Sequence, residues 1–185
     1  RFGQQVGAAF SAYDEFDLQG RLDAIDLGRS ALVGAALRQT GDAADGSNEY
    51  LFDVHHEVGA PPRKTCYLVE TAGRAGDEML VVHSRFPGSG AMPRDGSSPF
   101  ERHYRLGADS SFVPPTELRT YLVEHARNHR WLVELRWNGA VLLVCSHARA
   151  LHEPEEWRAL AALGKRCGAV LADAGVDGVS SGEPW

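Results

Sequence analysis

Residues 130–146, RWLVELRWNGAVLLVCS, constrain the fold more than any other part of the chain. Their centre is the pair Asn138-Gly139, which is typical of a two-residue type I′ turn because both central positions of that turn need a positive φ. Before the pair, large apolar residues alternate with other residues, and after it the run 141–145 is apolar throughout. This pattern predicts a β-hairpin that helps to build a core.

Two predicted helices flank this hairpin. The first is expected from Pro114 to about Asn128, because proline fits a first helical turn and apolar residues recur after it with helical spacing. The second begins at Pro154, where two glutamates follow at the positive end of the helix dipole. Alternation over 100–106 predicts a strand before the first helix. The second half of the chain is therefore predicted to run strand, helix, hairpin, helix.

The first half shows the alternation of β-strands. Segments 49–58 and 64–71 alternate between more apolar and more polar positions, and the turn-forming sequence 59–63 joins them, so we predict a second hairpin. Further strands are expected at 31–40, which a cluster of turn residues follows, and at 79–84. The prediction is an α+β fold, with an antiparallel β meander in the first half and the strand-helix-hairpin-helix order in the second.

The 185 residues are enough for one large domain or for two tightly joined halves. Residues 86–99 are rich in glycine, proline and serine, which is typical of a surface loop or of a seam between two halves. We therefore expect a β-rich half over 1–85, a connection over 86–99 and a second half over 100–185, with one compact domain as the alternative.

The balance of charge argues against nucleic acid as a partner. The chain has 19 lysines and arginines against 25 aspartates and glutamates, a formal net charge of −6, whereas non-specific nucleic-acid binding depends on clustered cations. Four arginines of the second half could still contact a protein partner or anionic lipid head groups: Arg119, Arg127, Arg130 and Arg136. Ordinary surface charge, offset by nearby glutamates, is the simpler interpretation.

The three cysteines, Cys66, Cys145 and Cys167, are far apart in the sequence and form no CxxC pair. An odd number of cysteines without metal-binding spacing predicts free thiols in a reducing compartment. The apolar surroundings of Cys145 and Cys167 favour inert packing over a nucleophilic role.

The strongest candidate for a chemical site is a histidine pair. His125 and His129 stand four residues apart on a predicted helix, a spacing that lets two imidazoles bind one zinc ion, with His103 or His147 as a third ligand. The HExxH order is absent, and near the end of a helix histidine also suits the negative end of the dipole. The sequence has no recognisable nucleophile, dinucleotide or calcium motif. We therefore predict no catalytic residues and no cofactor.

Short motifs spread along nearly the whole chain carry one resemblance: Gly7-Ala8-Ala9-Phe10, Gly28-Arg29, Phe52-Asp53, 59–65, Phe100-Glu101-Arg102-His103-Tyr104, 115–122 and Trp131. Their order is similar to that in an uncharacterised group of bacterial proteins, in which a soluble α+β domain follows an N-terminal membrane anchor. The chain departs from the group at Val54-His55-His56, where the group tends to have an aromatic-rich strand. The resemblance implies a membrane tether upstream of Arg1, and it supplies no catalytic residues.

The sequence itself has no apolar run of about 18 residues, so no transmembrane helix is predicted within it. The start at Arg1 instead of methionine indicates a processed or truncated piece. Together these observations predict a non-enzymatic soluble domain of a membrane-tethered bacterial protein, which acts through protein–protein contacts at the cytoplasmic face of the membrane and binds no nucleic acid or small molecule. Two alternatives stay open: a metal-binding enzyme or sensor that uses His125 and His129, and a lipid-binding module.

Overall fold

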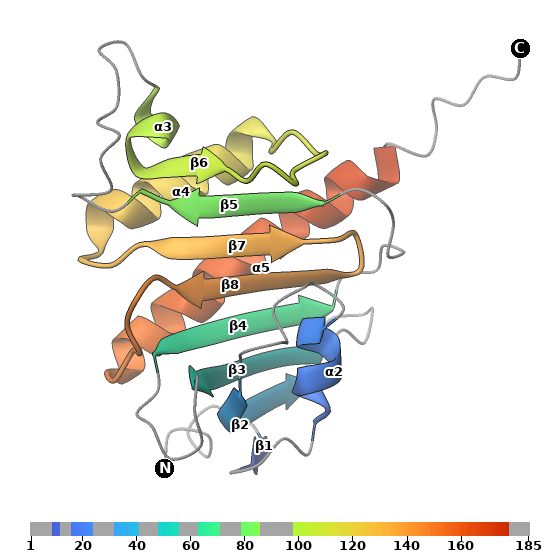
Figure 1. The fold of residues 1–185 in the computed structure, drawn as a ribbon, viewed down its shortest axis with the longest axis vertical. Helices are drawn as coiled ribbons and strands as arrows, with labels where there is room; N and C mark the ends of the chain where they lie inside the picture. The colour runs from blue at the N-terminus through green and yellow to red at the C-terminus, as the bar shows by residue number, and fades with distance from the viewer. Residues whose placement is uncertain are drawn as a thin grey trace, which may run out of the picture.

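The fold is one antiparallel sheet with helices on both of its faces (Figure 1). A computed structural model describes residues 9–11, 16–23, 32–40, 48–55, 63–70, 79–85 and 98–177. Within these ranges the strands are β1 (Ala9–Ser11), β2 (Leu32–Thr40), β3 (Asn48–His55), β4 (Lys64–Glu70), β5 (Leu80–Ser84), β6 (Tyr104–Leu106), β7 (Val133–Trp137) and β8 (Val141–Ser146). The helices are α2 (Leu18–Asp23), α3 (Pro99–His103), α4 (Thr116–Asn128) and α5 (Pro154–Asp177).

The strands follow the order β1-β2-β3-β4-β8-β7-β5-β6, and each pair is antiparallel. The predicted α+β class is therefore confirmed, with the meander β1 to β4 in the first half and the β7–β8 hairpin in the second. The strand predicted at 79–84 is not part of that meander, because β5 pairs with β7 and β6 of the second half. Strand β8 pairs with β4, so strands from both halves of the chain share this sheet. Whether the halves are separate domains stays a prediction. Of the predicted connection 86–99, residues 86–97 lie outside the described residues.

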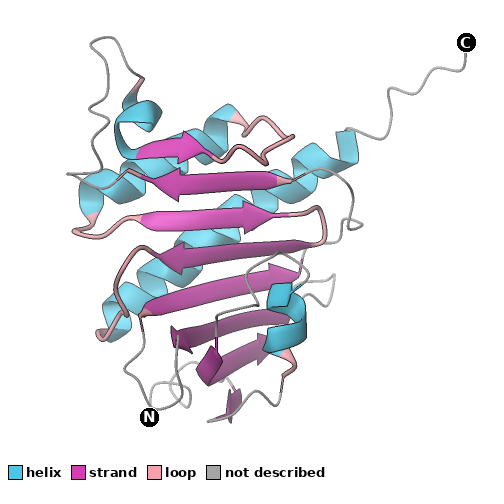
Figure 2. Ribbon diagram, viewed as in Figure 1, coloured by secondary structure: helices cyan, strands magenta, loops and turns pink. Residues whose placement is uncertain are grey.

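Helices α4 and α5 cover one face of the sheet, and α2 packs on the other (Figure 2). Between α4 and α5, the Arg166 side chain bridges the two helices, since its Nη2 lies 3.2 Å from Oε2 of Glu124 and its guanidinium stacks 3.8 Å from the Tyr121 ring centre. Helix α5 crosses β4 closely at Gly164, where a Cβ atom would overlap the ring of Tyr67. This crossing brings the helix down onto the middle of the sheet.

The prediction of a strand over 100–106 is wrong for residues 100–103. Residues Pro99–His103 form α3, and only Tyr104–Leu106 form a strand. The cause is a capping box, because the Ser98 hydroxyl accepts a hydrogen bond from the Glu101 amide at 3.2 Å and the Glu101 carboxylate accepts one from the Ser98 amide at 2.8 Å. With Pro99 at the first helical position, this short segment forms one helical turn before the chain continues as strand β6.

The β7–β8 hairpin is confirmed, but its turn is not the predicted type I′. Gly139 has φ of 90°, whereas Asn138 does not have a positive φ. The Asn138 amide donates to the Val141 carbonyl at 3.3 Å, so Gly139 and Ala140 are the two central residues. Glycine at the first central position is the requirement of a type II′ turn. Asn138 instead closes the loop with its side-chain oxygen, which accepts from the amides of Ala140 and Val141 at 3.2 and 2.9 Å.

The expectation of three free thiols is also wrong. Cys66 of β4 and Cys145 of β8 are direct neighbours in the register, with Cα atoms 4.1 Å apart, and they form a disulfide. Only Cys167 is free, and it is buried in α5. The pairing depends on two strands 79 residues apart being adjacent in the sheet, which no local pattern reveals.

Candidate functional site

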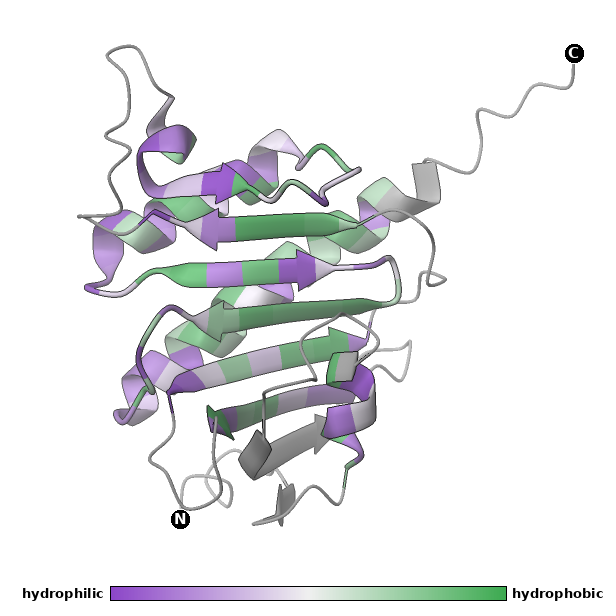
Figure 3. Ribbon diagram, in the orientation of Figure 1, coloured by the Kyte–Doolittle hydropathy of each residue, from purple (hydrophilic) through white to green (hydrophobic). Residues whose placement is uncertain are grey.

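The two faces of the sheet differ in how many strands bury apolar side chains under a helix. Along β8 every side chain from Leu142 to Cys145 is buried, because α5 covers one face and α2 the other. Along β7 the burial alternates, with Val133, Leu135 and Trp137 buried against the α4–α5 side and the residues between them half-buried. Figure 3 shows this change from the uniformly hydrophobic β8 to the alternating β7. Of the described helices, only α2 packs on this second face, and it reaches no further than β8.

At the Lys64 end of β4 and beyond β8 this face carries mostly charged side chains, although Val81 of β5 is buried beside Arg136. We call it the open face and define it by Lys64, His83, Arg105, Glu134, Arg136 and His147. Glu134 joins two of these residues, since its Oε2 lies 2.5 Å from Nζ of Lys64 and its Oε1 lies 3.0 Å from Nδ1 of His147. Burial alone would raise the pKa of the Glu134 carboxyl, but the hydrogen bonds and charges of Lys64 and His147 outweigh burial and lower it. The open face therefore holds an ionised carboxylate.

The cations of the open face also act on one another. Burial is the largest cause and lowers the pKa of His83; the charge of Glu134 opposes it, and the smaller effects of Arg105, Arg136 and Lys64 lower it. His83 is therefore neutral near pH 7, and the open face carries its positive charge on the lysine and the arginines.

A pocket of about 200 Å³ lies where the apolar and charged parts of this face meet. Its apolar lining comes from α2, β3, β4 and β8, with Leu22, Val54, Cys66, Leu143 and Cys145, and also from β5 and β7, with Val81, Val82 and Leu135. Its polar side is formed by Lys64, His83, Glu134 and Arg136. Arg136 pairs in the register with Leu143 of β8 on one side and with Val81 of β5 on the other, so charged and apolar residues are neighbours across these strands. The pocket thus combines a hydrophobic surface with fixed charges at one side.

The histidine pair named by the sequence lies elsewhere, at the end of α4. The rings of His125 and His129 stack with centres 4.4 Å apart, and the His125 ring packs edge-on against Trp131 at 4.4 Å. Burial, and secondly the neighbouring His129, lower the pKa of His125 to about 4. Across the described ranges, no group of three or more His, Cys, Asp or Glu side chains is placed to hold a metal ion. Zinc binding by this pair remains a prediction.

The four arginines proposed as a partner surface do not come together. Arg136 lies on β7 in the open face, whereas Arg119 is on α4, beyond the other face of the sheet. The Arg119 side chain donates from Nε to the Pro114 carbonyl at 3.0 Å and lies 5.9 Å from the Phe100 ring centre. Arg127 and Arg130 are exposed at and after the end of α4. The sequence analysis considered His147 only as a possible zinc ligand and missed the remaining open-face residues, although the alternation along β7 was a usable signal.

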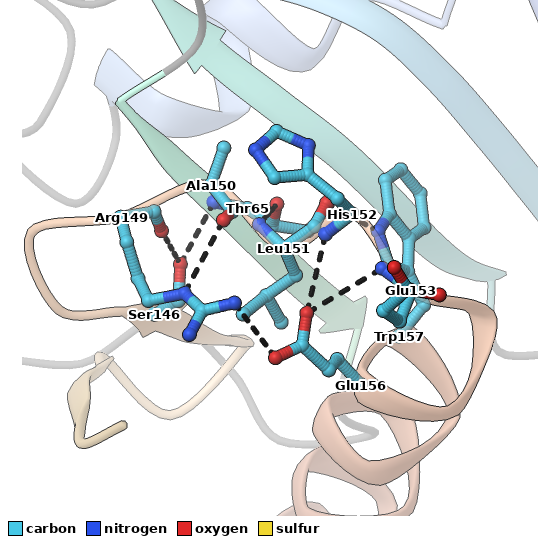
Figure 4. A network of polar contacts seen from close by, with 9 residues as sticks. All are labelled: Thr65, Ser146, Arg149, Ala150, Leu151, His152, Glu153, Glu156 and Trp157. Atoms are coloured by element: carbon cyan, nitrogen blue, oxygen red, sulfur yellow. Dashed lines mark hydrogen bonds and ion pairs between the residues drawn. The ribbon is translucent and has the colours of Figure 1, made fainter. Parts of the chain in front are cut away.

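A buried polar network at the start of α5 is structural (Figure 4). Ser146 Oγ accepts from the Thr65 amide at 2.9 Å and donates to the Arg149 carbonyl at 2.5 Å, and Thr65 Oγ1 accepts from the Leu151 amide at 2.9 Å. Glu156 then accepts from the His152 amide at 3.2 Å and pairs with Arg149 at 2.7 Å. Each hydroxyl is engaged with the backbone, so the network fixes the path from β8 into α5.

The free cysteine is no candidate nucleophile, since burial raises the pKa of the Cys167 thiol to about 12. None of the described helices is both long enough and apolar enough to cross a bilayer.

Comparison with known proteins shows the fold and no more. The sequence matches no protein family and no curated protein. Among solved structures, the crystal structure of the mycobacterial trehalose monomycolate transport factor A, TtfA, is similar, with a TM-score of 0.61 at 14% sequence identity. The match covers 92% of this chain and 90% of that chain.

Proposed function

We propose that this chain is a non-catalytic domain, held at a membrane surface in the intact protein, which binds an acidic protein partner on the open face. One observation carries the proposal: on the face that carries α2, the strands beyond β8 present mostly charged side chains, around the buried Val81, and none of the described helices covers them. A sheet face that stays outside the core is a surface on which a partner can dock.

The charge of the open face selects the kind of partner. Its residues include three permanent cations, Lys64, Arg105 and Arg136, against the single carboxylate of Glu134, which is a balance of 3 − 1 = +2. The whole chain has the opposite sign, with a formal net charge of −6. A local positive surface on an acidic protein steers acidic partners to that surface and away from the rest.

Two comparisons support the membrane and partner roles as analogies. The resemblance in sequence is to proteins with an N-terminal membrane anchor, and TtfA is named as a transport factor, a role that fits binding better than chemistry. The proposal departs from the sequence prediction in the side of the membrane. Disulfides persist in oxidising compartments, so the Cys66–Cys145 bond favours the outer face over the cytoplasmic one.

Photo-crosslinking in cells tests the docking surface. A photoreactive amino acid is placed at Arg105, on the open face, or at Arg127, on the exposed side of α4. We expect a discrete protein adduct from position 105 only, and we expect Arg136→Glu to abolish it while Arg130→Glu leaves it unchanged. Adducts from position 127 alone, or an adduct from 105 that survives Arg136→Glu, would overturn the proposed surface.

Thiol labelling of the same cells tests the compartment. Cells are lysed directly into denaturant that contains excess thiol-alkylating reagent, so that buried thiols react as well, and the number of labelled cysteines is read by mass. A location in an oxidising compartment predicts one labelled thiol, Cys167, before reduction and three after it. Three labelled thiols without reduction would indicate a reducing compartment such as the cytoplasm and would contradict the outer-face location.

A further inference from the structure

The Cys66–Cys145 disulfide lies at the end of the ladder between β4 and β8. The regular register of the two strands stops at this pair, and in the described sheet their pairing alone joins β1–β4 to β5–β8. Beyond the pair a side chain connects the strands, because the Thr65 amide donates to Ser146 Oγ at 2.9 Å (Figure 4). The bond therefore fixes the end of the ladder, where paired strands open most easily.

The ionised carboxylate of the open face lies directly beside this bond. Glu134 of β7 is the register partner of Cys145, so it continues the row of the disulfide across the sheet. Its two partners stand two residues from the cysteines, which places them on the same side of the strands. Lys64 precedes Cys66 and begins β4, and His147 follows Cys145 just after the end of β8. Each of the two bonded strands thus carries one partner of Glu134.

The contacts of Glu134 depend on how closely β4 is held to β8. Lys64 reaches across β8 to place its Nζ 2.5 Å from Oε2, while His147 Nδ1 lies 3.0 Å from Oε1. Neighbouring strands lie about 4.8 Å apart, so the backbones of β4 and β7 are roughly 10 Å apart. An ion pair needs its atoms within about 4 Å. Opening of the ladder at its Cys66 end would therefore separate Lys64 from Glu134.

We propose that the disulfide is a redox switch for the open face: the Lys64–Glu134–His147 contacts assemble only when the Cys66–Cys145 bond has formed. As it forms, the two thiols lose two protons and two electrons, and the disulfide of an exchange partner takes them up and becomes a dithiol. Partner binding is thereby confined to an oxidising compartment, a regulation that rests on the proposed function. Both cysteines are buried, at 1% and 6% exposure, so the bond persists in the folded chain.

Nuclear magnetic resonance of the lysine ammonium groups tests the geometry, because a paired ammonium group exchanges its protons with water slowly. The oxidised chain is compared with the chain refolded in a phosphine reductant. We expect faster exchange at Lys64 in the reduced chain, close to the rate in oxidised Glu134→Gln. Lys165 is the internal control, since its Nζ lies 2.9 Å from Oε2 of Glu49 and should keep its rate. An unchanged Lys64, an equal change at Lys165 or an unfolded reduced chain would each overturn the proposal.

Crosslinking in cells separates this switch from the protein contact itself. The double variant Cys66→Ala/Cys145→Ala should fold and lose the adduct from position 105, whereas Cys167→Ala removes the free buried cysteine and should keep the adduct. An adduct that survives in the double variant would overturn the switch, and so would a double variant that does not fold. If the unaltered chain forms no adduct, the protein contact is refuted, and the exchange rate at Lys64 still decides whether the bond assembles the open face.

Discussion

The close crossing of α5 over β4 yields the sharpest stability prediction, the substitution Gly164→Ala. A Cβ on Gly164 would lie 3.0 Å from Cγ of Tyr67 and closer still to Cδ1 and Cε1, whereas carbon atoms prefer about 3.5–4.0 Å. Tyr67 is 1% exposed and lies between the helix and the sheet, so its ring cannot swing into solvent. We therefore expect the helix to be pushed away from the sheet.

The expected size follows from two opposing effects. Overpacking a core costs about 1–3 kcal/mol, and this overlap with a rigid ring belongs at the upper end. Replacing glycine by alanine inside a helix contributes about 1 kcal/mol in the other direction. The net loss should be about 2 kcal/mol, which for a chain of this length lowers Tm by roughly 4–8 °C.

Gly168 is the matched control, one helical turn later in the same helix. Its Cβ would lie 3.3 Å from Cγ1 of Val69 and 3.6 Å from Cδ2 of Leu142, which is tight but close to ordinary contact. Gly168→Ala gains the same helix propensity with little overlap, so we expect Tm to stay equal or rise. In a Tyr67→Leu background, Gly164→Ala should lose most of its penalty. If thermal unfolding shows Gly164→Ala to be as stable as Gly168→Ala, the reasoning about the crossing is wrong.

Three further predictions concern the turn, the buried histidine and the disulfide. Gly139→Ala places a side chain at φ of 90° and should cost about 1–2 kcal/mol by urea unfolding; an unchanged midpoint would contradict the type II′ turn. The folded-state pKa of His125, about 4, lies below its ordinary 6.5. The unfolded chain therefore gains this proton first as pH falls, and up to about 3 kcal/mol of stability should disappear between pH 6.5 and 4. His125→Gln should flatten that part of the curve, and an identical pH profile would disprove it. Reducing the Cys66–Cys145 bond, which closes a loop across 79 residues, should cost about 2–5 kcal/mol; melting that is insensitive to reductant would count against the bond.

Local signals in the sequence were enough to identify most elements. The alternation of β7, the apolar run of β8 and the proline at the start of α5 each report a neighbourhood of a few residues, which is where hydrophobic period and capping act. The capping box of Ser98 and Glu101 was an equally local signal. It was missed because the alternation over 100–106 is also typical of a strand. The turn type at Gly139 was missed because one asparagine-glycine pair is compatible with more than one register.

The candidate site could not be read in the same way, because it is made by contacts between distant segments. The sequence named Arg136 but grouped it with arginines of α4 that lie beyond the other side of the sheet. Lys64 meets Glu134 across 70 residues, and Cys66 meets Cys145 across 79. Both contacts depend on the pairing of β4 with β8 in the sheet.

By itself, then, the sequence determined the α+β class, the two hairpins and the helices that flank the second one, because local periodicity and end signals specify such elements. Only the tertiary structure decided which strands are neighbours, and with that the disulfide, the pocket and the open face. Strand order is set by the burial of surfaces far apart in the chain, and the pairing of β4 with β8 is the step on which all three features depend.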